Sequence, residues 1–167
     1  KINNFNYAIL RYFNVAGSDI RNKIGIYKNN GQLIKNIASS LTSGNKIVNI
    51  FGNNYKTKDG TCIRDFIHVS DISQIHILAL KQIQKKTKSN LLLNCGYGRG
   101  YSILNIINRF EKIYKIKFQK NFLPKRDGDI VNMVCDNRKL KRILKFKSLF
   151  DINDIIKSSV FWEKNNG

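Results

Sequence analysis

Cysteine and histidine are scarce in this sequence, and their placement excludes several kinds of site. The three cysteines, Cys62, Cys95 and Cys135, are odd in number, widely separated and never arranged as CxxC. This pattern argues against a disulfide framework or a structural zinc site and is typical of a reducing compartment. The two histidines, His68 and His76, lie outside any HExxH motif. We therefore expect a cytoplasmic protein without a metal site.

Long apolar runs and a secretion signal are also missing. No apolar run approaches the roughly 20 residues that a membrane-spanning helix needs, and we expect no signal peptide, because the sequence contains no such pattern. The 167 residues, 42% of them hydrophobic, suffice for one domain with its own core. The chain opens on Lys1 and enters strand-like sequence at once. This favours the interpretation that it is the C-terminal piece of a longer protein.

Acidic residues are few, since 11 Asp and Glu stand against 30 Lys and Arg, which gives a formal net charge of +19. Such an excess of cations can bind nucleic acid by neutralising phosphates. However, the basic residues are scattered, with modest clusters only at Lys81–Lys88 and Arg138–Lys147, and no RNA-binding, zinc-finger or helix-turn-helix motif accompanies them. Nucleic-acid binding is therefore the weaker hypothesis, and solvated basic surfaces are favoured. A few cations could still hold a diphosphate.

Hydrophobic patterning predicts strands that alternate with helices. The apolar runs at Tyr7–Phe13 and Leu91–Cys95 are typical of strands buried on both faces. Asn14–Gly17 is predicted to turn the chain, and residues 18–30 to form a loop. Further strands are expected at Ile47–Phe51, Ile63–Val69 and Ile116–Phe122, with a short extended piece at Met133–Asp136. Helices are expected at Gln32–Leu41, from Ser70 or Asp71 past Ile83, at Ser102–Tyr114, around Leu140–Leu144 and from Asp151 onward. Asp151 is the expected N-cap of the last helix, and Asp154 three residues later makes an acidic relative of the capping box.

This alternation implies an α/β fold with a mixed, largely parallel sheet. Two strands alone cannot be buried on both faces, although the patterns of Tyr7–Phe13 and Leu91–Cys95 call for it. We therefore expect these segments to be the last strands of a larger sheet whose other members lie before Lys1.

The glycine-rich stretch Asn94–Ile103, NCGYGRGYSI, looks at first like a dinucleotide-binding turn. The dinucleotide fingerprint needs GxGxxG and an acidic residue about twenty positions later. This stretch reads GxGxGxS instead, KNF stands at that distance, and GxxGxxG occurs nowhere in the chain. We interpret the stretch as a strand end, a glycine turn and Ser102 as the N-cap of the next helix.

Three polar islands carry the candidate chemistry. Arg11–Gly17 (RYFNVAG) ends a predicted strand, where open α/β sheets place ligand contacts. Asp59–Asp71 (DGTCIRDFIHVSD) gathers charged and histidine side chains along one strand and the start of its helix. Pro124–Ile130 (PKRDGDI) is a loop that contains Arg126, which is either solvated or bound to a ligand.

The middle island also has structural interpretations. Asp65 and Asp71 are predicted to be a strand-end hydrogen bonder and a helix cap rather than an acid–base pair. His68 is predicted to be a satisfied core histidine. Arg64 lies among apolar residues, so it must either pair with Asp65 or await an anion. Hydrolase chemistry has little support, because no serine or cysteine occupies a nucleophile elbow.

Taken together, the islands resemble the C-terminal half of the UDP-glucose 4-epimerase family, within the extended short-chain dehydrogenases/reductases. LRYFNVAGSD, IFGNNYKTKDGTCIRDFIHVSDI, LNCGYGRGYS and DGD occur in the family's order and approximate spacing, over nearly the whole chain. The resemblance implies that residues 7–13 and 91–95 are terminal strands of a Rossmann sheet. It also implies that the rest of residues 1–167 is mostly a UDP-sugar domain and that the N-terminal NAD-binding domain is absent.

The resemblance further implies an activity, the interconversion of UDP-glucose and UDP-galactose by transient NAD-dependent oxidation at C4, in galactose metabolism. No tyrosine here has a lysine four residues later, so the family's YxxxK pair is missing. We therefore expect no catalytic residue in this chain, an isolated fragment that is inactive, and an N-terminal half as its partner. The intact protein would be a homodimer. Another nucleotide-sugar epimerase or a dehydratase of the same family is the alternative.

Carried over by position, the resemblance implies ten ligand-contacting residues. Phe13 would lie by the nicotinamide of NAD, Asn14 by the diphosphate and sugar, Gln32 and Leu33 by the nucleotide–sugar region, Asn49, Ile50 and Phe51 by the uracil, Arg64 and Arg126 by the diphosphate, and Asp129 by the ribose. Two positions depart from the family. Gln32 stands where Asn or His is usual, and Met133 where Tyr or Cys is usual, so the choice between hexose and N-acetylhexosamine stays open.

Overall fold

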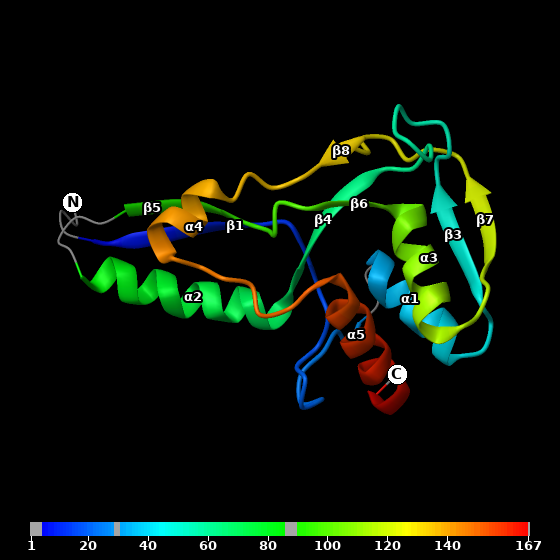
Figure 1. Cartoon of the computed structure of the whole chain (residues 1–167), viewed down its shortest axis with the longest axis horizontal. Helices are drawn as coiled ribbons and strands as arrows, with labels where there is room; N and C mark the ends of the chain where they lie inside the picture. Colours follow the sequence, from blue (N-terminus) through cyan, green and yellow to red (C-terminus); the bar gives the residue numbers. More distant parts are fainter. Residues whose placement is uncertain (1–4, 29–30, 86–89, 167) are drawn as a thin grey trace.

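Two parallel strand pairs lie at opposite ends of the molecule (Figure 1). The structure is a computed structural model, and it describes residues 5–28, 31–85 and 90–166. At one end β1 (Tyr7–Tyr12) pairs with β5 (Asn90–Cys95). At the other end β3 (Ile47–Phe51) pairs with β7 (Gln119–Leu123).

A third ladder, built around β4 (Ile63–His68), connects the two ends. β4 is parallel to β2 (Asn14–Ala16) and β8 (Asn132–Met133) and antiparallel to β6 (Gly100–Ser102). The predicted α/β fold with mixed, largely parallel pairing is therefore confirmed, although the described strands form three ladders rather than one sheet.

In the described part of the chain, five helices pack on these ladders in two groups. The helices are α1 (Leu33–Thr42), α2 (Val69–Gln84), α3 (Ile103–Tyr114), α4 (Arg138–Leu144) and α5 (Ile152–Asn166). The first core lies between α1, α3, α5 and the strands β3 and β4, and the second core between α2, α4 and the β1–β5 pair. Within the described residues, none of the helices has the length and apolar character needed to span a bilayer.

Two of the predicted helix caps are confirmed. The Ser102 hydroxyl accepts a hydrogen bond from the Asn105 N–H (3.1 Å) at the start of α3. At the start of α5, Asp151 Oδ1 accepts from the Asp154 N–H (3.1 Å), and Asp154 Oδ2 accepts from the Asp151 N–H (2.9 Å). This reciprocal pair is the acidic capping box that the sequence predicts.

Two local predictions were wrong. Asn14–Gly17, expected to turn the chain, instead contains β2, because it pairs with Phe66–His68 of β4 and this distant contact overrides local preference. α2 begins at Val69, and its cap is His68, whose Nδ1 accepts from the Ser70 N–H (3.1 Å). Residues 86–88 of the predicted basic cluster and residues 29–30 of the predicted loop lie outside the described residues.

The β1–β5 pair is buried on one face only. Tyr7, Ile9 and Leu92 are each more than 40% exposed, whereas Leu10 and Leu93 pack into the second core. A sheet of two strands leaves one face without a covering layer, as expected for this chain alone, and the larger sheet that would bury both faces stays a prediction. Among the described residues, β1 also has a strand partner on one edge alone.

Candidate functional site

A cavity of about 800 Å³ opens between the start of α1, the strands β2, β3 and β4, and the loop after β7. Its volume lies within the roughly 300–1,000 Å³ that is typical of small-molecule sites. Eight of the ten predicted ligand-contacting residues line it: Asn14, Gln32, Leu33, Asn49, Phe51, Arg64, Arg126 and Asp129. These residues come from five separate segments of the sequence, so the fold gathers them around one space.

Phe13 and Ile50 do not line this cavity. Phe13 lies between β1 and β2, where its N–H donates to the Cys95 carbonyl (3.1 Å). The side chain of Ile50 is buried in the first core. The predicted contact of Ile50 with uracil therefore stays a prediction that the side-chain geometry does not favour.

Among the described residues, β3 has a strand partner on one edge alone, and its other edge lies at the cavity. In a parallel strand, successive residues direct their N–H and C=O groups to alternate edges. The Gly52 N–H donates to Leu123 (2.9 Å) and the Lys46 carbonyl accepts from Gln119 (2.8 Å), so the even-numbered residues, Ile50 included, face β7. The backbone groups of Asn49 and Phe51 consequently face the opposite edge, on the side of the cavity that both residues line.

The N-terminus of α1 opens into the same cavity. Gln32 occupies the N-cap with extended backbone, its side chain makes no capping hydrogen bond, and no acidic residue lies in the first turn. Gln32, Leu33, Ile34 and Lys35 all line the cavity. Because the first N–H groups of a helix have no partner within the helix and carry the positive end of its dipole, this wall favours an anion.

Arg64 projects from β4 into the cavity and is held by three contacts. Its Nη2 lies 3.4 Å from Asp129 Oδ1, and its Nη1 donates to the carbonyl oxygens of Ile130 (2.5 Å) and Ile63 (2.9 Å). Of the two alternatives for Arg64, the pairing with Asp65 is wrong, because successive side chains of a strand point to opposite faces. The partner is Asp129, which lies 65 residues away along the chain.

Arg126 lies against an aromatic ring rather than a carboxylate. Its guanidinium carbon is 3.6 Å from the centroid of the Phe51 ring, a cation–π contact. Among the residues that the structure describes, Arg126 has no ion-pair partner. The cavity therefore contains two different arginines. Arg64 is paired with the Asp129 carboxylate, whereas no described carboxylate balances the charge of Arg126.

Asp65, Asp71 and His68 lie outside the cavity and are occupied by structural contacts. Asp65 is fully buried and accepts from the N–H groups of Tyr97 and Gly98. Burial raises its pKa, and the backbone hydrogen bonds oppose that rise. Asp71 accepts hydrogen bonds from the Tyr97 hydroxyl (2.5 Å) and the Leu149 N–H (3.1 Å), so it connects the glycine turn to the segment before α5. The prediction that Asp71 caps a helix is therefore wrong.

His68 is a buried core histidine, as its place on the strand predicts. Nε2 lies 3.2 Å from the Ser158 hydroxyl, and the ring stacks on Phe150 with 4.1 Å between centroids. Burial lowers its pKa, which favours the neutral imidazole. Both nitrogens are engaged, Nδ1 by the α2 cap and Nε2 by α5.

The glycine turn after β5 encloses Asp65 and leaves no room for a cofactor. The Gly98 N–H, in a residue with φ of +71°, donates to Asp65 Oδ2 (2.7 Å). A Cβ at Gly96 would lie 2.6 Å from the Cys135 Cβ and 2.9 Å from Asp65 Oδ2. The predicted sequence of strand end, turn and Ser102 cap is confirmed. The turn does not fit a dinucleotide pyrophosphate, because its backbone N–H groups at Tyr97 and Gly98 already donate to the Asp65 carboxylate.

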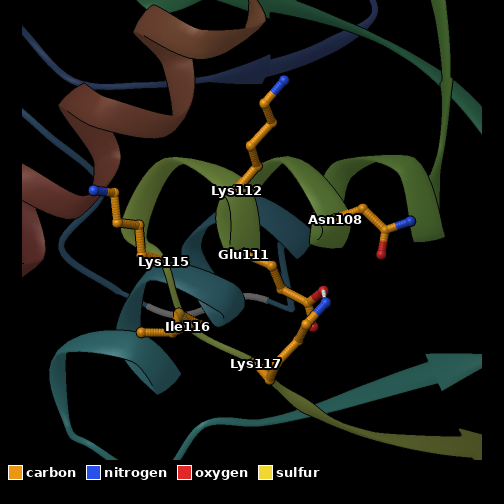
Figure 2. Close-up of a pocket in the computed structure, with 6 residues that line it drawn as sticks. All are labelled: Asn108, Glu111, Lys112, Lys115, Ile116 and Lys117. Atoms are coloured by element: carbon orange, nitrogen blue, oxygen red, sulfur yellow. Dashed lines mark hydrogen bonds and ion pairs between the residues drawn. The ribbon is translucent and has the colours of Figure 1, made fainter.

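A second hollow, of about 580 Å³, lies at the C-terminal end of α3 and has a basic rim (Figure 2). Its acidic residue, Glu111, accepts hydrogen bonds from Lys117 Nζ (3.1 Å), Lys120 Nζ (2.7 Å) and the Phe118 N–H (3.0 Å). Figure 2 shows Lys112 and Lys115 extending away from Glu111. The polar groups of this hollow therefore serve the local fold rather than converge on a ligand. The described residues hold no group of three His, Cys, Asp or Glu placed for a metal ion.

Sequence reasoning missed one charged residue of the cavity wall. Lys35 lies off the apolar stripe of α1, so its position in the sequence predicts solvent exposure, yet it is 6% exposed and lines the cavity. Its partner is Glu163, 128 residues further along the chain. No local signal in the sequence indicates such a pair.

Comparison with proteins of known family identifies relatives of this chain. The NAD dependent epimerase/dehydratase family model matches residues 1–96. The UDP-glucose 4-epimerase of Lactobacillus helveticus is 38% identical over 99% of this chain and 51% of its own length, and that of Bacillus subtilis is 33% identical over 98% and 49%. The chain thus spans about half the length of the curated relatives it matches.

Solved structures give the same result. A UDP-glucose 4-epimerase from Stenotrophomonas maltophila with bound NAD and formylated UDP-arabinopyranose is 34% identical, with a TM-score of 0.88 over 95% of this chain and 47% of that chain. The Bifidobacterium longum enzyme in complex with NAD+ and UDP is 32% identical, with a TM-score of 0.84 over 95% and 48%. Because the family model covers more than half of the sequence, the chain belongs to the NAD-dependent epimerase/dehydratase family.

Proposed function

We propose that the 800 Å³ cavity binds the UDP part of a UDP-sugar, and that the chain is the substrate-binding, C-terminal half of a UDP-glucose 4-epimerase. The observation that carries this proposal is the convergence of eight predicted residues, including two arginines, on one cavity. Two UDP-glucose 4-epimerases related to this chain at 34% and 32% identity were solved with a UDP-sugar and with UDP.

The diphosphate would lie between the two arginines and the start of α1. Arginine suits a diphosphate because its planar fork donates paired, charge-assisted hydrogen bonds. Arg126 brings a charge that no described carboxylate balances, and Arg64 brings one shared with Asp129. The first-turn N–H groups of α1 would add neutral donors and the positive end of the helix dipole.

The uracil would lie along the open edge of β3. The backbone groups of Asn49 and Phe51 offer a donor and acceptor pattern suited to the imide edge of a pyrimidine. The ribose would reach Asp129, and the sugar would lie near Asn14 and Gln32. Binding by the nucleotide rather than the sugar suits epimerisation, because the 4-keto sugar must turn within the site.

The remaining chemistry would come from the other half of the enzyme. This chain contains no YxxxK pair, and its glycine turn does not fit a dinucleotide. NAD, when bound, supplies the hydride-accepting chemistry, and Phe13 is the residue of this chain that we place beside the nicotinamide. β1 and β5 would be terminal strands of the Rossmann sheet, which would continue from the open edge of β1.

Titration of the chain with UDP, followed by isothermal calorimetry, tests the proposal. We expect saturable binding that Arg64→Ala and Arg126→Ala each weaken by about 10- to 100-fold, since charge-assisted hydrogen bonds contribute roughly 1.5–3 kcal/mol. Arg138→Ala is the matched control, because Arg138 pairs with Asp136 on the surface and lies outside the cavity. Equal losses in all three variants, or no saturable binding at all, would refute the proposed site.

The sugar itself is a finer question. A UDP-Glc/GlcNAc 4-epimerase from Campylobacter jejuni is 36% identical to this chain, with a TM-score of 0.76. Met133 lies directly beside Arg64 in the β4–β8 register, close to the proposed diphosphate site. We propose UDP-glucose and UDP-galactose as the substrates, with an N-acetylhexosamine nucleotide as the alternative. Parallel turnover assays on the assembled enzyme would separate them.

A further inference from the structure

Lys35 of α1 and Glu163 of α5 form a buried ion pair beside the cavity. Their side chains are 6% and 5% exposed. Lys35 Nζ donates to Glu163 Oε1, and the Ser39 hydroxyl donates to Glu163 Oε2 at 2.5 Å. Both carboxylate oxygens of Glu163 are therefore engaged by α1, from two successive turns.

This pair connects the cavity wall to a helix that is itself fixed on the central ladder. Lys35 lines the cavity in the same helical turn as Leu33. α5 is held against β4 through the 3.2 Å contact between Ser158 and His68. The network thus runs from the proposed ligand site through α1 and α5 to β4.

Stability alone does not account for such a pair. Removing two charges from water is costly, and well-packed apolar residues often hold two helices equally well. An ion pair with a second hydrogen bond differs from apolar contacts in being directional, because it fixes how far one helix can turn or slide along the other. The part of α1 that this restrains is the turn that faces the cavity.

We propose that Lys35 and Glu163 are positioning residues that set the first turn of α1 for the diphosphate of the ligand. The inference rests on the proposed function, since it needs UDP as the ligand. Because Glu163 holds Lys35, the residues that contact the phosphates are the arginines and the first-turn N–H groups, and Lys35 acts through the placement of the helix.

A double apolar replacement separates positioning from stability. Lys35→Met/Glu163→Met removes both charges together, so neither is left buried and unpaired. The matched control is Glu111→Met/Lys120→Met, which removes an ion pair between the buried Glu111 and the partly exposed Lys120, neither of which lines the cavity (Figure 2 shows Glu111). UDP affinity is measured by calorimetry in the cold, where circular dichroism shows every variant folded, and thermal midpoints are recorded beside it.

We expect about tenfold weaker UDP binding in Lys35→Met/Glu163→Met and a change of less than twofold in the control pair. Lys35→Arg, which keeps the cation and its partner, should bind UDP within about threefold of the unmodified chain. Ser39→Ala, which removes one hydrogen bond and is the mildest change, should weaken binding about twofold.

Two results would overturn the inference. Unchanged UDP affinity in the folded Lys35→Met/Glu163→Met variant would reduce the pair to a structural contact. Tighter binding in Glu163→Gln would mean that a released Lys35 contacts the phosphates directly. Failure of the unmodified chain to bind UDP is a different outcome, because it refutes the proposed function and removes the ligand on which this inference depends.

Discussion

At the scale of single residues, the two arginines of the cavity differ in what balances their charge. Arg64 shares its guanidinium with Asp129 at 3.4 Å, whereas Arg126 stacks on Phe51. A phosphate entering the cavity therefore competes with Asp129 for Arg64 and meets Arg126 without such competition. If Asp129 also contacts the ribose, its carboxylate lowers the affinity of the cavity for a phosphate but adds a contact that is specific to a nucleoside.

Asp129→Asn should consequently change selectivity rather than abolish binding. We expect inorganic pyrophosphate to bind about threefold more tightly, because Arg64 is released, while the preference for UDP over pyrophosphate shrinks. Competition calorimetry with the two ligands measures this ratio. Asp127→Asn makes the same charge change on an exposed neighbour outside the cavity and should leave the ratio unchanged. A ratio that is the same in both variants would remove Asp129 from the site.

Residue motifs predicted the cavity better than they predicted its contacts. Asn14, Arg64 and Arg126 could be named from the sequence because each lies in a short polar island, and all three do line one cavity. The sequence left Asp65 or an anion as the partner of Arg64 and named Asp129 only as a ligand contact, because a pair formed across 65 residues has no local signal. Lys35 was missed for the same reason, because Glu163 is remote in the chain.

At the scale of elements, short strands were the least predictable part. Helices α1 and α3 follow from their apolar spacing, because a helix buries a stripe that its own sequence encodes. β2 is three residues long and forms because it pairs with β4, so its local sequence predicts a turn instead. The cap of α2 is His68, which ordinary cap preferences do not include.

Glu111 links α3 to the start of β7, and this link is predicted to be acid-sensitive. Burial opposes ionisation of Glu111, but hydrogen bonds from Lys120, Phe118 and Lys117 outweigh it and lower its pKa to about 2. A carboxyl whose pKa is lowered on folding stabilises the protein above its unfolded pKa. That contribution is lost as the pH falls from about 4.5 toward 2.

Glu111→Gln should therefore make the free energy of unfolding less dependent on pH in the acidic range. We expect the free energy of unfolding, measured with urea, to lose on the order of 1–3 kcal/mol less between pH 5 and pH 2 in this variant than in the unmodified chain. Asp127→Asn, a change at an exposed carboxylate, should leave the slope as it is. An unaltered acid limb in Glu111→Gln would contradict the assigned link.

At the scale of the whole molecule, we expect the β1–β5 pair to be the end of a larger sheet. Tyr7, Ile9 and Leu92 leave one face apolar and exposed, and the described residues place no strand on the far edge of β1. The chain also spans about half the length of its curated relatives. The location of the protein in a reducing compartment and its assembly as a homodimer remain predictions.

The chain alone should not turn over UDP-galactose in the presence of NAD, because it contains no YxxxK pair. Adding the separately produced N-terminal half of a related UDP-glucose 4-epimerase should restore measurable turnover and raise the thermal midpoint of the chain. Ile9→Lys, on the exposed face of β1, should weaken that assembly without altering UDP affinity. Turnover by the isolated chain would contradict the division of labour between the two halves.

The most direct test of the account is a residue-resolved titration of the chain with UDP, read by amide chemical shifts in nuclear magnetic resonance. If UDP binds in the cavity, we expect saturable shifts in the first turn of α1, at Asn49 and Phe51, and in the loop that carries Arg126 and Asp129. Saturable shifts confined to the basic hollow at the end of α3, or shifts that never saturate, would contradict it.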